Sequence, residues 1–184
     1  MWRERTQLVV KREGLEKLTQ AHVLVVGLGG VGAFVAEFLA RAGVGTLTIV
    51  DGDTVDTTNK NRQLIALNST IGKSKARLMG ERIKDINEKI NLHIIEDFLT
   101  PETAYDLVNK EFDYVADCID SISPKISLIR ACHDKRIRVI SSMGAGGILD
   151  PSKIKVADIS RTRDCPLART IRKRLKKEGI HPKF

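Results

Sequence analysis

Cysteine is scarce and widely spaced in this chain. The 184 residues include three cysteines, Cys118, Cys132 and Cys165, and no two of them form a Cys-x-x-Cys pair. Structural zinc sites use close cysteine pairs, and disulfide frameworks use several cysteines in a short secreted chain. The spacing therefore argues against a structural zinc site and against a disulfide framework.

Long apolar runs are lacking as well. No stretch approaches the roughly 18 apolar residues that a membrane helix requires. The N-terminus, Met1 to Arg5, is charged and is not followed by an apolar stretch, so no signal peptide is expected. A hydrophobic content of 42% and a charged content of 29% are typical of a globular protein. We expect a chain without a membrane segment that resides in the cytoplasm.

Aromatic residues are few, at 4% of the chain, so the composition does not point to base stacking. The net charge of +8 is concentrated near the C-terminus. Residues 161–177 contain eight basic residues and one acidic residue, whereas the rest of the chain contains 23 basic and 22 acidic residues. A local patch of this kind favours a polyanionic partner such as the backbone of tRNA. A small acidic protein, or a solvated helix face with no partner, would explain it too.

Apolar runs typical of buried strands alternate with segments of helical spacing. Strands are expected over residues 22–26, 47–50, 92–95, 114–117 and 139–141. Helices are expected over residues 31–42, 73–87, 101–108, 124–134 and 166–177. This alternation predicts a Rossmann-like, doubly wound α/β fold, with a mostly parallel sheet and helices on both faces.

The length suits one domain with a single sizeable core, so residues 1–184 are expected to form one domain. Residues 1–20 are expected to be a helical lead-in, and residues 161–184 a basic C-terminal segment. Residues 154–159 alternate between apolar and polar side chains, which predicts an added antiparallel strand.

A glycine-rich turn follows the first expected strand. Gly27, Gly29, Gly30 and Gly32 lie in the pattern G-x-G-x-x-G, directly before a helix. Such glycines let backbone N–H groups approach phosphates at the positive end of the helix dipole. Asp51 ends the second expected strand, where a carboxylate accepts hydrogen bonds from ribose hydroxyls. The pattern predicts a nucleotide site, although a tight strand-to-helix turn has the same glycines and a nicotinamide dehydrogenase has the same motif.

The polar segment from Asp51 to Gln63 favours ATP over a nicotinamide cofactor. A nucleotide attacked at its α-phosphate needs cations around the developing charge, and Arg62 and Lys75 are candidates for that role. Asp120 follows the fourth expected strand and is a candidate ligand of Mg²⁺, which prefers carboxylate oxygen. Taken singly, Arg62 would also suit a surface salt bridge, Lys75 a solvated helix face, and Asp120 a helix cap.

Several motifs together resemble the ThiF/MoeB/HesA superfamily of ubiquitin-activating-like adenylating enzymes. Besides the glycine turn, they are D-x-D followed by N-x-x-R-Q, the G-K-S-K-A helix start and the D-C-I-D-S segment, at residues 51–63, 72–76 and 117–121. Within the superfamily, residues 141–147, 150–151 and 156–159 are similar to the branch of tRNA threonylcarbamoyladenosine dehydratases. The resemblance covers nearly the whole chain, although that branch runs further at its C-terminus, so this chain is expected to be shortened relative to it.

The resemblance implies a role for each matching position. Gly27, Gly29, Gly30 and Gly32 would cradle ATP and Asp51 would bind its ribose, while Asp120 would hold Mg²⁺. The phosphates would be surrounded by Asp53, Asn59, Arg62, Gln63 and Lys75. Arg5 resembles the arginine that dimeric members lend to the neighbouring subunit's site, which implies a homodimer. An exposed N-terminal charge with no such role is the alternative for Arg5.

The implied reaction is the ATP-dependent cyclisation, with loss of water, of threonylcarbamoyladenosine next to the anticodon of a tRNA. It would pass through a carboxyl adenylate, with Arg62, Lys75, Asp120 and Arg5 as catalytic residues. Three alternatives stay open: activation of the C-terminal Gly-Gly of a ubiquitin-like sulfur carrier, a nucleotide-binding module without catalysis, and a nicotinamide dehydrogenase. A sulfur-transfer protein as partner, and Cys165 as a reactive thiol beside arginines, stay open too.

Overall fold

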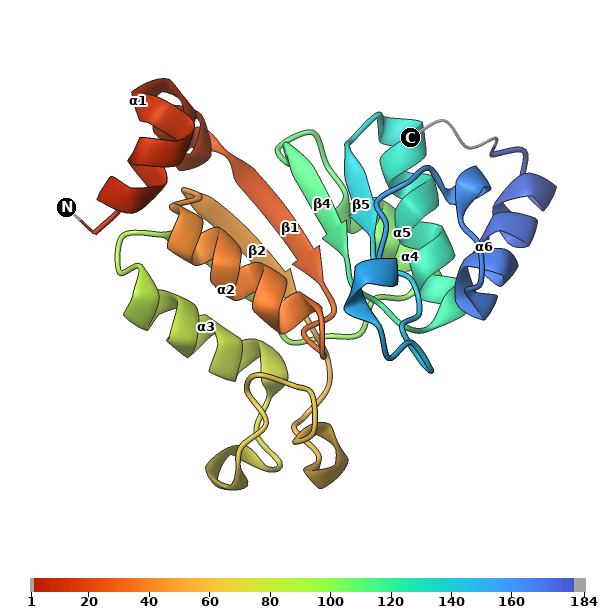
Figure 1. Ribbon diagram of the computed structural model, residues 1–184, viewed down its shortest axis with the longest axis horizontal. Helices are drawn as coiled ribbons and strands as arrows, with labels where there is room; N and C mark the ends of the chain where they lie inside the picture. The colour runs from red at the N-terminus through yellow and green to blue at the C-terminus, as the bar shows by residue number, and fades with distance from the viewer. Residues whose placement is uncertain (1, 181–184) are drawn as a thin grey trace.

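The computed structural model describes residues 2–180. Its centre is a five-stranded sheet, all parallel, in the order β3-β2-β1-β4-β5 (Figure 1). The strands are β1 His22–Val26, β2 Thr46–Val50, β3 Asn91–Ile95, β4 Tyr114–Asp117 and β5 Val139–Ser141. All five predicted strands are present, and the predicted Rossmann-like α/β fold is confirmed.

Six α-helices accompany the sheet within the described residues. They are α1 Glu4–Gln20, α2 Gly32–Ala42, α3 Lys75–Ile86, α4 Pro101–Leu107, α5 Ile122–Lys135 and α6 Pro166–Lys177. None of them is long and apolar enough to cross a membrane.

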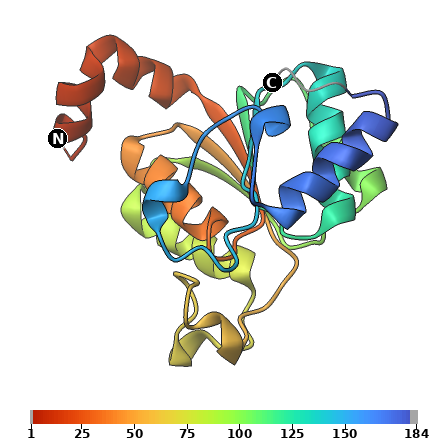
Figure 2. The ribbon, with the colours of Figure 1, turned by 45° about the vertical axis from the view of Figure 1, so that its right-hand side comes forward.

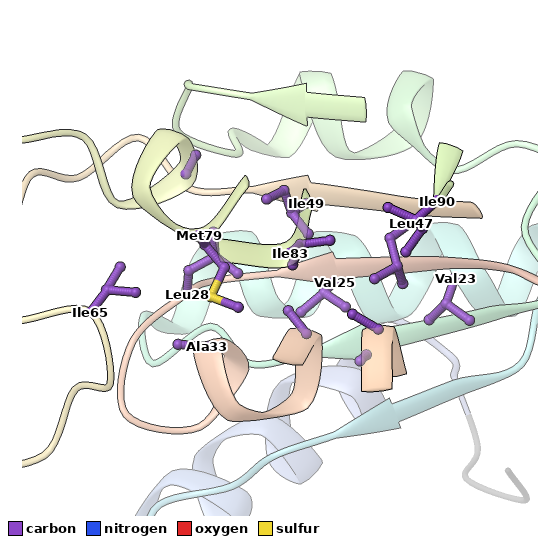
Figure 3. Packing of buried hydrophobic residues seen from close by; sticks show 14 of the residues in the cluster. Val23, Val25, Leu28, Ala33, Leu47, Ile49, Ile65, Met79, Ile83 and Ile90 are labelled. Carbon is purple, nitrogen blue, oxygen red and sulfur yellow. The ribbon is translucent and has the colours of Figure 1, made fainter. Parts of the chain in front are cut away.

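The central strand β1 shows how the sheet is covered on both faces. Val23 and Val25 pack in one apolar cluster with residues of α2 and α3, which Figure 3 shows from close by. Leu24 and Val26 point the other way, into a cluster with residues of α4 and α5. A strand buried on both faces needs a continuous apolar run, because successive side chains alternate between faces. The order of strands reverses direction at β1, so a crevice for ligands is expected between β1 and β4 at the carboxyl edge.

Helix α1 lies at the opposite edge of the sheet, where the strands begin. One residue separates it from β1, and Figure 1 shows it on the far side of the sheet from the 51–74 segment. The helix is bent at Lys11, whose φ of 61° and ψ of 179° are not helical. This conformation is essentially reserved for glycine, so Lys11 is strained and α1 consists of two helical pieces.

The strand predicted over residues 154–159 is wrong. Two short 3₁₀ turns, Pro151–Lys153 and Ile159–Arg161, flank the segment, and no strand pairs with it within the described residues. Val156 is 90% exposed there. Alternating apolar and polar side chains give an extended segment one apolar face and one polar face. A strand also needs a neighbouring backbone for its hydrogen bonds.

Candidate active site

The glycine turn closes tightly between β1 and α2. Gly27 has a φ of +87°, and a Cβ at Gly32 would lie 1.7 Å from the carbonyl oxygen of Gly27. No side chain fits at either position, because the first needs left-handed backbone and the second has no space. Leu28, within the turn, is fully buried against the core (Figure 3). The turn is therefore anchored on its inner side while its backbone remains at the carboxyl edge of the sheet.

Asp51 holds two segments of this edge together. Its Oδ2 accepts a hydrogen bond from the backbone N–H of Leu28 at 2.6 Å, and its Oδ1 accepts one from Asp53 at 2.8 Å. The carboxylate thus joins the glycine turn to the loop after β2. It stands at the end of the second strand, at the position the sequence predicted for a ribose-binding acid.

Lys75 is fixed beside this loop at the start of α3. Its Nζ lies 2.8 Å from Oδ2 of Asp53, and its backbone N–H donates to the carbonyl of the same residue. The Lys75 side chain is only 6% exposed, whereas Asp53 is 57% exposed. Lys75 is therefore not one of the solvated helix lysines, and a charge held in this way is oriented before any ligand arrives.

Arg62 lies over the glycine turn. A Cβ at Gly30 would meet its Cγ at 3.4 Å. Its guanidinium is exposed, and Nη1 donates to the carbonyl of Thr58 at 3.1 Å and to the side chain of Asn61 at 2.9 Å. Among the described residues no carboxylate pairs with it, so the surface salt-bridge interpretation is not supported.

Asn59 and Gln63 have buried amide side chains and stand on either side of Arg62 in the sequence. Oδ1 of Asn59 accepts from the backbone N–H of Asp56 at 3.1 Å and shapes the short helical turn there. Oε1 of Gln63 is buried without a hydrogen-bond partner in residues 2–180, and its Nε2 lies 3.7 Å from where a Cβ of Gly29 would be. An unpartnered buried polar atom beside a glycine cradle fits a polar ligand that completes its hydrogen bonds.

Asp120 lies on the loop after β4, next to the glycine turn. A Cβ at Gly27 would stand 2.8 Å from the carbonyl oxygen of Cys118, so the two loops are in contact. Asp120 is exposed, and the N-cap of α5 is Ser121, which leaves the helix-cap interpretation unsupported. Residues 2–180 contain no cluster of three metal-binding side chains. Mg²⁺ is commonly held by one or two carboxylates together with substrate phosphates, and a lone Asp120 fits that arrangement.

Comparison with known proteins agrees with this geometry. The family model described as "ThiF family" matches residues 3–177. The chain belongs to the ThiF family. A tRNA threonylcarbamoyladenosine dehydratase of Bacillus subtilis is 47% identical over 96% of this chain and 69% of its own length. The predicted resemblance to that branch of the family is confirmed.

Solved structures and more distant relatives indicate which members of the family this chain resembles more. The Escherichia coli dehydratase TcdA in complex with ATP has a TM-score of 0.92 and 41% identity, over 95% of this chain and 72% of that one. The same protein has been solved with AMP. A molybdopterin-synthase adenylyltransferase of Haemophilus influenzae is 34% identical over 73% of this chain and 56% of its own length. The chain spans about two thirds, between 64% and 69%, of the bacterial dehydratases it matches.

A buried ion pair between β4 and α5, near the candidate site of this ThiF-family chain, was not predicted from the sequence. Nζ of Lys125 on α5 lies 2.7 Å from Oδ2 of Asp117 at the end of β4, and both side chains are fully buried. Ser141 at the end of β5 bonds to both of them. Burial raises the pKa of Asp117, and the Lys125 charge opposes that rise. The only signal in the sequence was Lys125, a charged residue on the otherwise apolar face of the helix expected over residues 124–134.

The three cysteines of this ThiF-family chain have different surroundings. Burial raises the pKa of Cys118 and of Cys132 to about 12, so neither thiol ionises near neutrality. Sγ of Cys165 caps α6, accepting from the backbone N–H of Ala168 at 3.3 Å, and lies 3.5 Å from the carbonyl oxygen of Gly144. Gly144 follows β5, so Cys165 stands near the carboxyl edge of the sheet.

Arg5 is the one predicted site residue that the structure does not bring to the others. It lies in the first half of α1, on the edge where the strands begin, whereas the glycine turn, Asp51 and Asp120 follow strand ends (Figure 1). Within one chain, Arg5 is therefore far from the candidate site.

Proposed function

We propose that this chain uses ATP to adenylate the carboxylate of a threonylcarbamoyl group on a tRNA adenosine next to the anticodon. The same side chain then closes into a ring, and the net change is loss of water. One observation carries the proposal: Arg62 lies against the glycine turn, and Lys75 is joined to the same turn through Asp53 and Asp51. The similarity to dehydratases, one of them solved with ATP, supports the choice of substrate.

Each residue of the site would contact a different part of the nucleotide. Gly27, Gly29, Gly30 and Gly32 would present backbone N–H groups to the phosphates at the start of α2. Asp51 would accept hydrogen bonds from the ribose hydroxyls while it keeps its bond to Leu28. Asn59 and Gln63 would contact the polar part of the nucleotide, and Gln63 would thereby satisfy its buried oxygen.

Arg62 and Lys75 would act on the α-phosphate. The attacking carboxylate oxygen forms a bond to phosphorus, and the bond to the pyrophosphate oxygen breaks. Negative charge grows on the phosphate and the leaving group, and preorganised cations stabilise it without reorganisation. Asp53 keeps the Lys75 ammonium in place. Asp120 would hold Mg²⁺, which neutralises phosphate charge when bound.

The second step needs little from the protein besides orientation. The nucleophile that displaces AMP belongs to the same side chain as the activated carboxyl group. A tethered nucleophile has a high effective concentration, so an internal attack does not require a catalytic thiol. The high pKa of Cys118 and Cys132 agrees with a route that does not pass through either thiol.

The experiment that tests the function is incubation with ATP, Mg²⁺ and threonylcarbamoylated tRNA. We expect AMP to form and the modified nucleoside to become lighter by one water in mass spectrometry. A protein extended to the length of its relatives is the matched control. If the extended protein also leaves the nucleoside unchanged, the proposal is wrong.

Activation of a sulfur carrier ending in Gly-Gly is the second candidate, favoured by the shared adenylation geometry and by the similarity to an adenylyltransferase. It predicts pyrophosphate exchange that depends on such a carrier and not on tRNA. The same experiments would identify a nucleotide-binding module without catalysis, because such a module would bind ATP and form no AMP with either substrate. The cytoplasm as location, and a sulfur-transfer protein as further partner, belong to the same proposal.

A homodimer would bring Arg5 to the site. Because Arg5 lies at the edge where the strands begin, it can serve a site only in a neighbouring subunit. Mixing inactive Arg5→Ala chains with inactive Asp51→Ala chains should restore part of the AMP formation, since one site in the mixed dimer has both residues. Sedimentation as a single 20.4 kDa chain, with full activity of Arg5→Ala, would contradict this.

A further inference from the structure

The outer face of helix α6, at residues 169–177, is a strip of basic side chains. We propose that this strip binds the phosphate backbone of the tRNA next to the reacting nucleoside. The inference rests on the proposed function and adds to it the surface that positions the substrate. It is independent of the nucleotide site, because no residue of α6 belongs to that site.

Helix α6 is held rigidly by its inner face. Ile171 and Leu175 are buried in a cluster with Ile126 and Ile129 of α5. Nη1 of Arg172 donates to the carbonyls of Ile159 and Thr162, so this arginine serves the fold rather than a ligand. Figures 1 and 2 show α6 on the outer side of α5, away from the sheet.

The basic side chains of α6 that remain point to solvent. The exposed ones are Arg169, Lys173, Arg174, Lys176 and Lys177. Within the described residues none of these five forms an ion pair; the nearby pair joins Arg130 of α5 to Glu178 at 3.3 Å. Like charges kept so close repel one another, and a polyanion relieves that repulsion.

The position of α6 connects this strip to the site. The N-terminal end of the helix is in contact with the loop after β5 through Cys165 and Gly144. That loop stands at the same edge of the sheet as the glycine turn and Asp120. The strip occupies residues 169–177 of this helix and is about 13 Å long, so it can contact more than one phosphate of a backbone that starts near this edge.

The composition of the strip favours nucleic acid over an acidic protein. Protein interfaces place apolar and aromatic residues at their centre and contain few lysines. Apart from Pro166, the exposed residues of α6 are all lysine or arginine, with no apolar centre. RNA backbone requires only cations along its path, and its binding depends on counterion release. The ligand that fits this strip is therefore a series of backbone phosphates.

The test is a double charge reversal, Lys173→Glu with Lys177→Glu. These two residues are four apart on one face of α6, and neither contacts the core or the nucleotide site. We expect tRNA affinity to fall about tenfold or more at 0.1 M salt and the slope of log affinity against log salt to become shallower by about one to two. ATP binding should stay unchanged, and the tRNA concentration for half-maximal AMP formation should rise.

The matched control is Lys89→Glu with Lys110→Glu, which makes the same change in net charge at exposed loop positions on the opposite edge of the sheet. It should alter tRNA affinity by less than half as much in log units. Equal effects of the two pairs would mean that only total charge matters, and the proposal would be wrong. If the unaltered protein binds tRNA through this strip but leaves its nucleoside unchanged, the surface stands and the proposed reaction fails.

Discussion

Arg62→Ala should slow AMP formation by about two to three orders of magnitude, the usual effect of removing one preorganised donor from a developing negative charge. Arg62 lies against Gly30 with its guanidinium exposed, where the phosphates of a bound nucleotide would be. Its neutral partners, Thr58 and Asn61, impose no competing charge. The rate of AMP release under saturating ATP and tRNA measures the effect.

The controls separate catalysis from folding and binding. ATP affinity should change much less than the rate, because the arginine acts most strongly on charge that appears during the reaction. Asn61→Ala removes only an acceptor of the Arg62 side chain and should slow the reaction far less. Arg62→Lys should recover part of the rate but not all, since lysine lacks the planar fork of donors. A rate unchanged in Arg62→Ala would show that this side chain has no role in the transition state.

Lys125→Met should lower the free energy of unfolding by about 3 to 5 kcal/mol, because it leaves a buried carboxylate without its charged partner. Asp117 and Lys125 are both fully buried and 2.7 Å apart, with Ser141 bonded to each. Denaturation by urea at neutral pH measures the loss. The double variant Lys125→Met with Asp117→Leu should regain most of it, since replacing both charges by apolar groups is often nearly neutral.

The pH dependence of this variant gives a second measurement. Burial already raises the pKa of Asp117 in the folded protein above its value in the unfolded chain. The folded state then favours the protonated carboxyl group, so the contribution of Asp117 to stability is greatest at low pH and falls as pH rises from its unfolded to its folded pKa. Without Lys125 that pKa rises further, and the gap in stability between variant and parent should narrow as pH falls. An equal gap at acidic and neutral pH would contradict the buried-charge explanation.

The fold was largely predictable because the central strands β1, β2 and β4 are mostly buried, which requires apolar runs, and the helices between strands alternate with them. Helix α6 was predicted over residues 166–177 and has those bounds, since Pro166 begins it and its apolar positions recur at helical spacing. The positions of the glycine turn after β1 and of Asp51 after β2 were also predicted, because both depend on a strand end followed by a local pattern. The strand expected over residues 154–159 failed because pairing depends on a distant neighbour.

The sequence by itself determined the α/β class, the nucleotide-type turn and the local concentration of positive charge. Each of these follows from residue types at short spacing, where geometry is set by the backbone. The tertiary structure decided the rest. Only packing shows that Lys125 is buried against Asp117, that Lys75 is fixed while Arg62 stays exposed, and that Arg5 lies at the wrong edge to serve its own chain. These facts depend on contacts between residues many positions apart, which no local pattern records.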